Sequence, residues 1–458
     1  MPFQSIDPST GEVLASYPEH DARLVAAAVD RAAEASRAWA ATPLAERTAV
    51  LRRAAALLRS EADALALLAA REMGKPVRQG RAEVEKCALG CEHYADHAAA
   101  MLAPEPAPSD AAKSYLRFDP LGVVLAIMPW NFPYWQVFRL AAPALAAGNV
   151  VLLKHAPNVP GCAQAIEQLL ARAGLPFGGL QALFVSPDVA GQLIAHPVVR
   201  GVTLTGSTRA GADVAAKAGR ALKKTVLELG GSDAFVVRAD ADVPAVARAA
   251  AQARTQNAGQ SCIAAKRFLV AAPLADAFVE AFRRELEALR VGDPKRDDTD
   301  IGPLARLDLR ETLDGQVRRS IDAGAKLVTG GRSLPGPGFF YAPTLLDHVL
   351  PDMPVAREET FGPAAAVLRV SGDVEAVAVA NASEYGLGAS VWTRSVAEGE
   401  ALAARLEAGS VFVNGIVKSD PRLPFSGVKR SGYGRELGVH GLREFTNVKT
   451  VWIGPART

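Results

Sequence analysis

Cys262, in the segment NAGQSC, is the residue of this sequence best suited to covalent chemistry. Its neighbours are small or polar, and it follows a predicted helical stretch from Ala245 to Arg254. A buried, inert core cysteine is the common alternative for a lone thiol. Because a free thiol has a pKa of roughly 8.5, a nucleophile needs nearby dipoles or a base to raise its thiolate fraction. Cys262 is therefore a candidate nucleophile that depends on its surroundings.

Two further polar residues stand where predicted strands end. Glu228 lies in VLELGG, after an apolar strand and before two glycines. Burial would raise its pKa and suit it to activate water as a general base, whereas a salt-bridged glutamate at a strand end is the alternative. Asn131 stands between two prolines in PWNFP, where its rigidly held amide could donate a hydrogen bond to an oxyanion. The alternative is that Asn131 only stabilises a turn, as asparagine commonly does.

Two segments are candidates for binding phosphate. Thr205 to Gly211 reads TGSTRAG and joins a predicted strand to a predicted helix, a place where a helix N-terminus can hold phosphate. The spacing is not GxGxxG, so a plain strand-to-helix turn is the alternative. Lys154 ends the strand VVLLK and could reach a ribose or phosphate, or it could be a solvated lysine.

The elements that must position these residues are short apolar strands alternating with helices. This alternation predicts βαβ units and a doubly wound parallel sheet, followed by a second α/β unit after Gly231. Strands are predicted at 150–154, 180–185, 201–205, 234–237, 267–270 and 364–370, and helices at 164–173 and 210–222.

The remaining extended segments predict a smaller β element. Residues 114–118 and 121–128 are predicted to form two strands joined by a turn at Asp119 and Pro120. Residues 445–453 are predicted to be a strand with no nearby hairpin partner, which could complete the sheet of a neighbouring subunit.

Composition excludes several classes of protein. The 458 residues carry a formal net charge of +2, so no charge excess favours nucleic acid or an anionic membrane. The most apolar stretch, 121–130, is shorter than the roughly 18 residues that a membrane-spanning helix needs. Four cysteines without a CxxC pair predict neither a disulfide framework nor a metal site. Together with an N-terminus that lacks a targeting pattern, they favour the reducing cytoplasm.

Seven segments in order give the chain a family resemblance. They are PWNFP, VVLLKHAP, TGSTRAG, LELGG, GQSC, EETFGP and PFSGVKRSGYGRE, and they span nearly the whole chain. In this combination the sequence resembles the aldehyde dehydrogenase superfamily. VLLKHAPNVPGCA and WNFPYWQVFR are most similar to bacterial succinate semialdehyde dehydrogenases, which implies NAD(P)-dependent oxidation of succinic semialdehyde to succinate.

The resemblance implies a role for each candidate. Cys262 would attack the aldehyde carbon, and Asn131 would hold the oxyanion together with the Cys262 backbone N–H. Hydride would then leave for the nicotinamide, and Glu228 would activate water to hydrolyse the thioester. The expected cofactor-binding residues are Trp130, Lys154, Pro157, Gly206, Ser207, Glu359 and Phe361.

The residues expected to bind the substrate depart from the family pattern at two positions. Some succinate semialdehyde dehydrogenases carry an arginine six residues before the nucleophile and a second cysteine two residues after it, where this chain has Gln256 and Ala264. Arg139 is the expected clamp for the distal carboxylate, and Trp135 and Ser419 are further expected substrate contacts. The alternative for Arg139 is an ion pair on a helix surface.

The resemblance also implies domains, assembly and cofactor. The expected divisions are a dinucleotide-binding domain (1–106 and 123–229), a catalytic domain (230–442) and oligomerisation strands (107–122 and 443–458) of a homodimer or homotetramer. Pro157 stands where NAD-preferring relatives commonly have a glutamate that binds the adenine ribose. We therefore expect NADP to be preferred and NAD to be accepted, with Lys154 and His155 offering positive charge.

Three alternatives to this function remain. A broad-range or betaine-type aldehyde dehydrogenase would share the chemistry, since only Arg139 and Ser419 favour an acidic substrate. A CoA-acylating dehydrogenase would not need the base Glu228, and a catalytically silent relative would be expected to lose Cys262 or Glu228.

Overall fold

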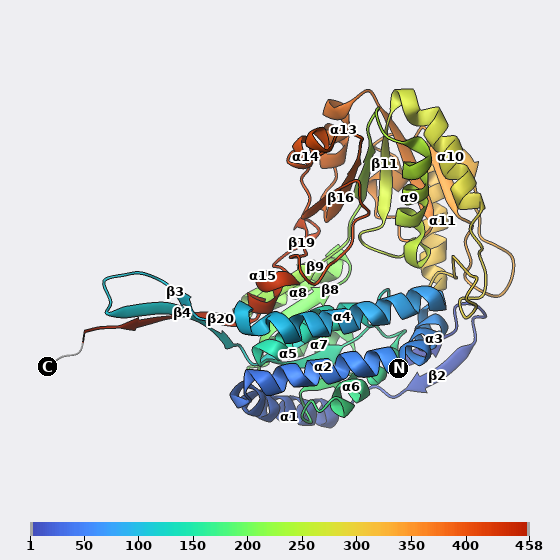
Figure 1. Ribbon diagram of the computed structural model, residues 1–458. Coiled ribbons are helices and arrows are strands. Elements are labelled where there is room, and N and C mark those ends of the chain that lie inside the picture. The colour runs from blue at the N-terminus through green and yellow to red at the C-terminus, as the bar shows by residue number, and fades with distance from the viewer. Residues whose placement is uncertain (1–2, 456–458) are drawn as a thin grey trace.

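The computed structural model describes residues 3–455, which form two α/β lobes and a projecting β-sheet (Figure 1). The sheet of the first lobe has the strand order β19–β9–β8–β5–β6–β7, with all strands parallel except β19. Its strands are β5 (Val123–Ile127), β6 (Val150–Lys154), β7 (Leu180–Ala182), β8 (Val199–Thr205), β9 (Lys224–Glu228) and β19 (Gly432–Tyr433). The strand order reverses between β5 and β8, and such a reversal opens a crevice at the carboxyl ends of the strands.

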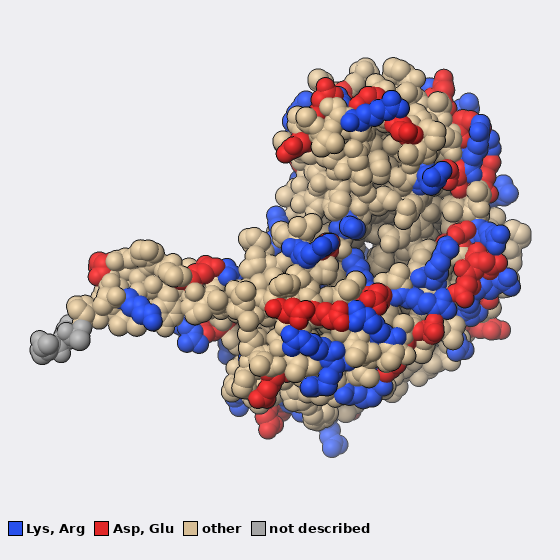
Figure 2. Space-filling model, viewed as in Figure 1, with Lys and Arg blue, Asp and Glu red and all other residues tan. Residues whose placement is uncertain are grey.

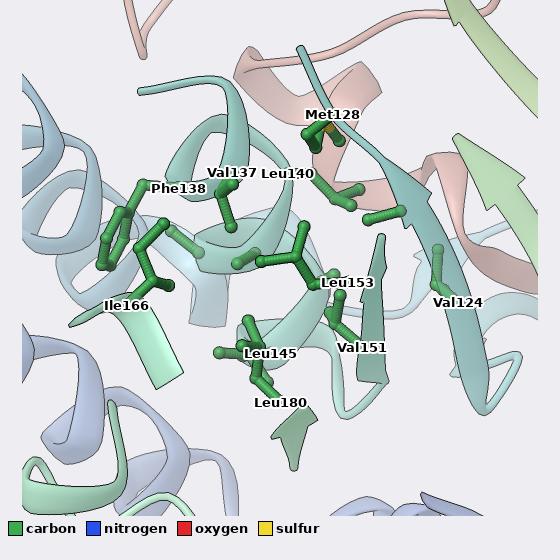
Figure 3. Close-up of a cluster of buried hydrophobic side chains, with 14 of the residues drawn as sticks. Val124, Met128, Val137, Phe138, Leu140, Leu145, Val151, Leu153, Ile166 and Leu180 are labelled. Carbon is green, nitrogen blue, oxygen red and sulfur yellow. The ribbon is translucent and has the colours of Figure 1, made fainter. Parts of the chain in front are cut away.

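Helices cover both faces of this sheet. They are α1 (Ala22–Ala41), α2 (Leu44–Ser60), α3 (Ala62–Met73), α4 (Val77–Met101), α5 (Trp135–Ala147), α6 (Pro160–Arg172), α7 (Pro187–Ala195) and α8 (Thr208–Arg220). Figure 3 shows Val137, Leu140 and Leu145 of α5 among Val124, Val151 and Leu153 of the adjoining strands. Full burial of each such side chain contributes roughly 1.5–3 kcal/mol, so α5 and the loop before it are firmly held.

The second lobe contains a seven-stranded sheet in the order β12–β13–β14–β11–β10–β16–β17, in which only β12 is antiparallel to its neighbour. Its strands are β10 (Asp233–Val237), β11 (Ala265–Ala271), β12 (Lys326–Thr329), β13 (Thr344–Asp347), β14 (Ala364–Val370), β16 (Gly388–Trp392) and β17 (Ser410–Val413). Its helices are α9 (Val243–Thr255), α10 (Ala275–Glu287), α11 (Leu307–Asp322), α12 (Pro354–Arg357), α13 (Asp373–Asn381) and α14 (Val396–Ala403).

A three-stranded sheet projects from the body of the molecule (Figure 1). Its antiparallel order is β20 (Thr446–Ile453), β4 (Lys113–Pro120) and β3 (Glu105–Pro106). The remaining elements are β1 (Phe3–Ile6), β2 (Val13–Tyr17), β15 (Tyr385–Gly386), β18 (Val428–Lys429), α15 (Gly438–Glu444) and the 3-10 turns η1 (Gln256–Gly259) and η2 (Ala272–Leu274).

The α/β fold with two parallel sheets and a small β extension confirms the predicted class, and β6 and β14 match their predicted bounds. One prediction about strand pairing was wrong, because β4 and β5 belong to different sheets and form no hairpin. As predicted, β20 has no hairpin partner nearby in the sequence; it pairs along its whole length with the distant β4 of the same chain, and its pairing with a neighbouring subunit stays a prediction. The predicted domain ranges remain predictions, and their ends at 1–2 and 456–458 lie outside the described residues.

The surface is hollowed between the two lobes, as Figure 2 shows. Over the visible face, Lys or Arg side chains alternate with Asp or Glu. Within residues 3–455, no helix has both the length and the apolar character needed to cross a membrane.

Candidate active site

The three residues predicted to perform the chemistry come from both lobes. Asn131 follows β5, Glu228 is the last residue of β9, and Cys262 lies between η1 and β11. Cys262 is partly exposed, while Cys87, Cys91 and Cys162 are buried. The negative charge of Glu228 contributes to the raised pKa of Cys262, so these side chains share one electrostatic neighbourhood. The fold thus gathers the predicted nucleophile and base.

A strained backbone run carries the chain into the nucleophile segment. Asn257, Ala258 and Gly259 have φ angles of 55°, 54° and 74°, in the left-handed region. Such angles cost free energy in non-glycine residues and persist only where the surroundings enforce them. Here the buried guanidinium of Arg254 donates 2.6 Å hydrogen bonds to the carbonyls of Gly259 and Gly362. Arg254 therefore holds the run against the segment at Gly362.

A network of amides connects Asn131 to the same run. The Asn131 Nδ2 donates to the Gln260 carbonyl at 3.1 Å, and the Asn257 Nδ2 donates to the Asn131 carbonyl at 2.7 Å. The Gln260 Oε1 accepts the Ala305 backbone N–H at 2.9 Å, which fixes that side chain. An amide nitrogen carries two protons, so Asn131 keeps one N–H for another acceptor.

Burial dominates the electrostatics of the site. It raises the pKa of Cys262 to about 12, although the charges of Lys266 and Arg139 act in the opposite direction. It also raises the pKa of Glu228 to about 8, opposed by Arg139 and reinforced by Glu436. Among the described residues, the Glu228 Oε1 has no hydrogen-bond partner. A buried carboxyl with an unused oxygen and a pKa near neutrality can exchange protons with water.

Comparison with known proteins identifies the family. The model of the aldehyde dehydrogenase family matches residues 1–451. The chain belongs to the aldehyde dehydrogenase family. It is 49% identical to a "Probable succinate-semialdehyde dehydrogenase [NADP(+)]" of Synechocystis, over 99% of this chain and 100% of that one. It is also 49% identical to a "Succinate-semialdehyde dehydrogenase [NADP(+)] 1" of Mycobacterium tuberculosis, with the same coverage.

A solved structure agrees with this membership. The succinic semialdehyde dehydrogenase of Streptococcus pyogenes in complex with NADP+ is 38% identical and covers 99% of this chain and 100% of its own, with a TM-score of 0.97. The chain is thus an NAD(P)-dependent oxidoreductase of this family, as its motifs predicted.

Four of the residues that are predicted to bind cofactor in this aldehyde dehydrogenase lie at the carboxyl edge of the first sheet. Trp130 follows β5, Lys154 ends β6, and Gly206 and Ser207 join β8 to α8. Ser207 caps α8, because its Oγ accepts the Ala210 N–H at 3.3 Å, and the α8 N-terminus therefore points its dipole toward this edge.

Lys154 is a half-buried cation at the end of β6. Burial lowers its pKa, and no acceptor or carboxylate within residues 3–455 contacts its Nζ. A half-buried ammonium without a carboxylate partner, at the same edge of the sheet as the α8 N-terminus, fits a phosphate-bearing dinucleotide.

The nicotinamide end also has candidate residues. The rings of Trp130 and Phe361 meet edge to face, with their centroids 5.7 Å apart. Glu359 accepts the Gly231 N–H at 3.0 Å, and its Oε1 lies 3.7 Å from the Nζ of Lys266. Phe361 and Glu359 enter from the second lobe, so the cofactor candidates span both lobes, as the three catalytic candidates do.

His155 does not offer the positive charge that the sequence suggested. It is buried, its Nε2 contacts the Pro133 carbonyl at 2.9 Å, and its Nδ1 accepts the Ala156 N–H at 2.8 Å. Burial lowers its pKa to about 4, so the ring is neutral at physiological pH. His155 fixes the loop after β6 instead.

Arg139 is placed differently from the predicted clamp. The side chain is buried, forms an ion pair with Glu436, donates to the Thr205 Oγ1 at 3.2 Å and lies 5.0 Å from the centre of the Phe425 ring. A substrate carboxylate would have to compete with the carboxylate of Glu436, at the cost of a buried ion pair. The ion pair of Arg139 is thus internal rather than on a helix surface, and its contact with the substrate carboxylate stays a prediction.

Trp135 and Ser419, the other two predicted substrate contacts, lie together. The Trp135 Nε1 donates to the Ser419 Oγ at 2.9 Å, and the same oxygen accepts from the Lys86 Nζ at 2.7 Å. Sequence reasoning missed Lys86, Asn257, Gln260 and Glu436. In the sequence Lys86 resembles any helix-surface lysine, while NAGQSC contained Asn257 and Gln260 but gave no sign of their contacts with Asn131.

Proposed function

We propose that this aldehyde dehydrogenase oxidises succinic semialdehyde to succinate, with NADP preferred and NAD accepted. The observation that carries the proposal is the 49% identity, over nearly the full length, to relatives named as NADP-dependent enzymes for this substrate. The grouping of Cys262, Glu228 and Asn131 at one site supports the covalent chemistry that such an oxidation requires.

In this proposal Cys262 forms the covalent bond to the substrate. Its sulfur attacks the aldehyde carbon, its proton leaves to solvent, and a thiohemiacetal forms. The free Asn131 N–H and the Cys262 backbone N–H stabilise the oxygen as it gains negative charge. When bound, the dinucleotide supplies the acceptor for the hydride of that carbon, so that an acyl thioester remains on Cys262.

Glu228 then serves the hydrolysis. Its carboxylate takes a proton from water, and the water oxygen attacks the thioester carbonyl. The carbon–sulfur bond breaks, the acid leaves, and Cys262 is regenerated. The raised pKa of Glu228 suits this step, since the carboxylate is a stronger base than an exposed glutamate.

The proposed preference for NADP rests on Pro157 and Lys154. Pro157 is exposed beyond the end of β6, where a glutamate would stand in many NAD-preferring relatives. The Coulomb repulsion between a glutamate carboxylate and a 2′-phosphate charge 4 Å away is about 4 kcal/mol at an effective dielectric near 20. Proline carries no charge, so this repulsion is absent. The unpaired Lys154 adds a favourable charge.

A substrate panel tests the proposed function. Purified enzyme is assayed with succinic semialdehyde, glutaric semialdehyde, butanal, benzaldehyde and betaine aldehyde, each with NADP and with NAD. The highest kcat/KM is expected for succinic semialdehyde with NADP. Equal values across the aldehydes would favour the broad-range alternative. Pro157→Glu should shift the cofactor ratio toward NAD, chiefly by weakening NADP.

Assembly and location belong to the same proposal. We propose a homodimer or homotetramer joined through the sheet of β3, β4 and β20, because β20 is an edge strand with Val448, Trp452 and Ile453 exposed. We propose a cytoplasmic location because all four cysteines are free thiols, which suits a reducing compartment.

A further inference from the structure

Lys266, the second residue of β11, is a fully buried cation beside the nucleophile segment. Its Nζ donates a hydrogen bond to the carbonyl of Cys262 at 2.6 Å and another to the carbonyl of Ser261 at 3.1 Å. The Oε1 of Glu359 lies 3.7 Å from the same nitrogen. An ammonium carries three protons, and a buried one is costly unless it finds such partners. The position of Lys266 is therefore determined by its contacts with the nucleophile segment.

The carbonyl of Cys262 lies between Lys266 and the loop that follows Glu228. A Cβ at Gly231 would lie 2.7 Å from this oxygen, so the backbone of the loop passes directly against it. The Gly231 N–H in turn donates to the Glu359 carboxylate at 3.0 Å. The ammonium thus connects the peptide of the nucleophile, which comes from the second lobe, to the loop after β9 of the first lobe.

The charge of Lys266 also acts on the thiol. Burial raises the pKa of Cys262 to about 12, and the charge of Lys266 opposes this rise more strongly than that of Arg139. The carboxyl groups of Glu359 and Glu228 reinforce the rise. Because the thiolate is the attacking form, the nearest cation that favours it bears directly on reactivity.

Two acids favour the charged form of Lys266 itself. Burial lowers its pKa, while the charges of Glu359 and Asp233 oppose this change and that of Arg254 reinforces it. The Asp233 Oδ2 has no hydrogen-bond partner in the described part of the chain. A thiolate at Cys262 also favours the ammonium, so the two charges stabilise each other.

We propose that Lys266 is a positioning residue for the nucleophile, whose ammonium fixes the peptide of Cys262 against the loop after Glu228 and favours the thiolate over the thiol. This inference rests on the covalent role of Cys262 in the proposed function. No bond is made or broken at Lys266, and the proton of the thiol leaves to solvent as in the proposed reaction.

The test measures how fast iodoacetamide alkylates Cys262 as the pH is varied. Cys262 is partly exposed whereas the other three cysteines are buried, and peptide mass spectrometry confirms the modified site. Lys266→Met and Lys266→Gln remove the charge, so the rate at about pH 8 should fall roughly tenfold, which corresponds to a rise of about one unit in the pKa of the thiol. Lys266→Arg keeps the charge and should stay within about threefold of the wild-type rate. With saturating cofactor, kcat/KM for the preferred aldehyde should fall by similar factors, because it includes the attack of Cys262.

Lys223→Met is the matched control. Lys223 is half-buried in the turn between α8 and β9, at the opposite end of β9 from Glu228, and its Nζ also donates to a backbone carbonyl, that of His196. This variant loses the same kind of hydrogen bond and the same charge away from the nucleophile. Its alkylation rate should equal that of the wild-type enzyme.

The outcomes separate Lys266 from the proposed function. Lys266 variants with a lower melting temperature but the wild-type alkylation rate would overturn the proposal, because a purely structural lysine gives this result. Turnover in Cys262→Ala would instead refute the covalent mechanism, and the alkylation series would still decide whether Lys266 activates the thiol. If Lys266→Met fails to fold, Lys266→Gln, which can still donate to one of the two carbonyls, decides the outcome.

Discussion

At the scale of single residues, Glu228 has a burial and a pKa that suit the second half of the proposed reaction. In Glu228→Gln, one equivalent of reduced cofactor should form rapidly, because attack by Cys262 does not require the carboxylate. Later turnover should fall by about 10²- to 10⁴-fold, the usual contribution of a general base. Stopped-flow absorbance measures both phases. Cys262→Ala should give neither phase, and a slow Glu228→Gln reaction without a burst would assign Glu228 to an earlier step.

The pH dependence of turnover follows from the same carboxyl. Because burial raises the pKa of Glu228 to about 8, the basic form is lost as the pH falls below that value. Where hydrolysis limits turnover, kcat should therefore rise with pH below about 8, reach half its maximum near pH 8 and level off above about pH 9. Arg139, Glu436, Arg435 and the Ser426 hydroxyl face this group and set its titration. The same profile in Glu228→Gln would assign the titration to another group.

Arg139 should affect stability more than substrate choice. Arg139→Met leaves Glu436 buried without its partner, and breaking a buried ion pair costs about 3–5 kcal/mol. Urea unfolding measures the loss, and the double variant Arg139→Met/Glu436→Gln should recover part of it. The kcat/KM values for succinic semialdehyde and butanal should fall by similar factors. A loss of kcat/KM confined to succinic semialdehyde would show that Arg139 binds the distal carboxylate of the substrate.

At the scale of elements, the left-handed run before Cys262 requires glycine at position 259. A Cβ at Gly259 would lie 2.3 Å from the Gly362 carbonyl oxygen, on a residue with φ of 74°. Gly259→Ala should therefore displace η1, lower stability by about 1–3 kcal/mol or more and reduce kcat by at least tenfold. Thermal unfolding and steady-state kinetics measure these effects.

The matched control for this substitution is Gly315→Ala in α11, where a Cβ meets nothing within 4 Å. It should be neutral or slightly stabilising, since alanine favours helix. If Gly259→Ala behaves like this control, the run does not position Cys262.

At the scale of the whole molecule, the projecting sheet should join subunits. Val448 and Trp452 on β20 are about half exposed, at 54% and 53%. Val448→Asp/Trp452→Asp should shift the protein toward smaller assemblies in light scattering, because charge opposes the burial of this strand. Val374→Asp, on the exposed start of α13 in the other lobe (Figure 1), should leave the assembly unchanged. A wild-type monomer would contradict the proposed assembly.

Local patterns in the sequence determined much of this protein. Apolar runs such as VVLLK became strands buried on both faces, because a run without polar alternation cannot face water. The ordered motifs identified the family. Asn131 and Glu228 come to one edge because they follow the parallel strands β5 and β9 of the first sheet, whereas Cys262 reaches the site from the other lobe, between η1 and β11.

Tertiary structure decided which groups became partners. The sequence could not show that β20 pairs with β4, since strand pairing depends on distant backbone hydrogen bonds rather than on local pattern. Nor could it show that Glu436, about three hundred residues further along the chain, neutralises Arg139, or that the Lys266 ammonium is buried against the Cys262 carbonyl. The energy of a charge depends on its burial and on its nearest counter-ion, and the fold sets both quantities.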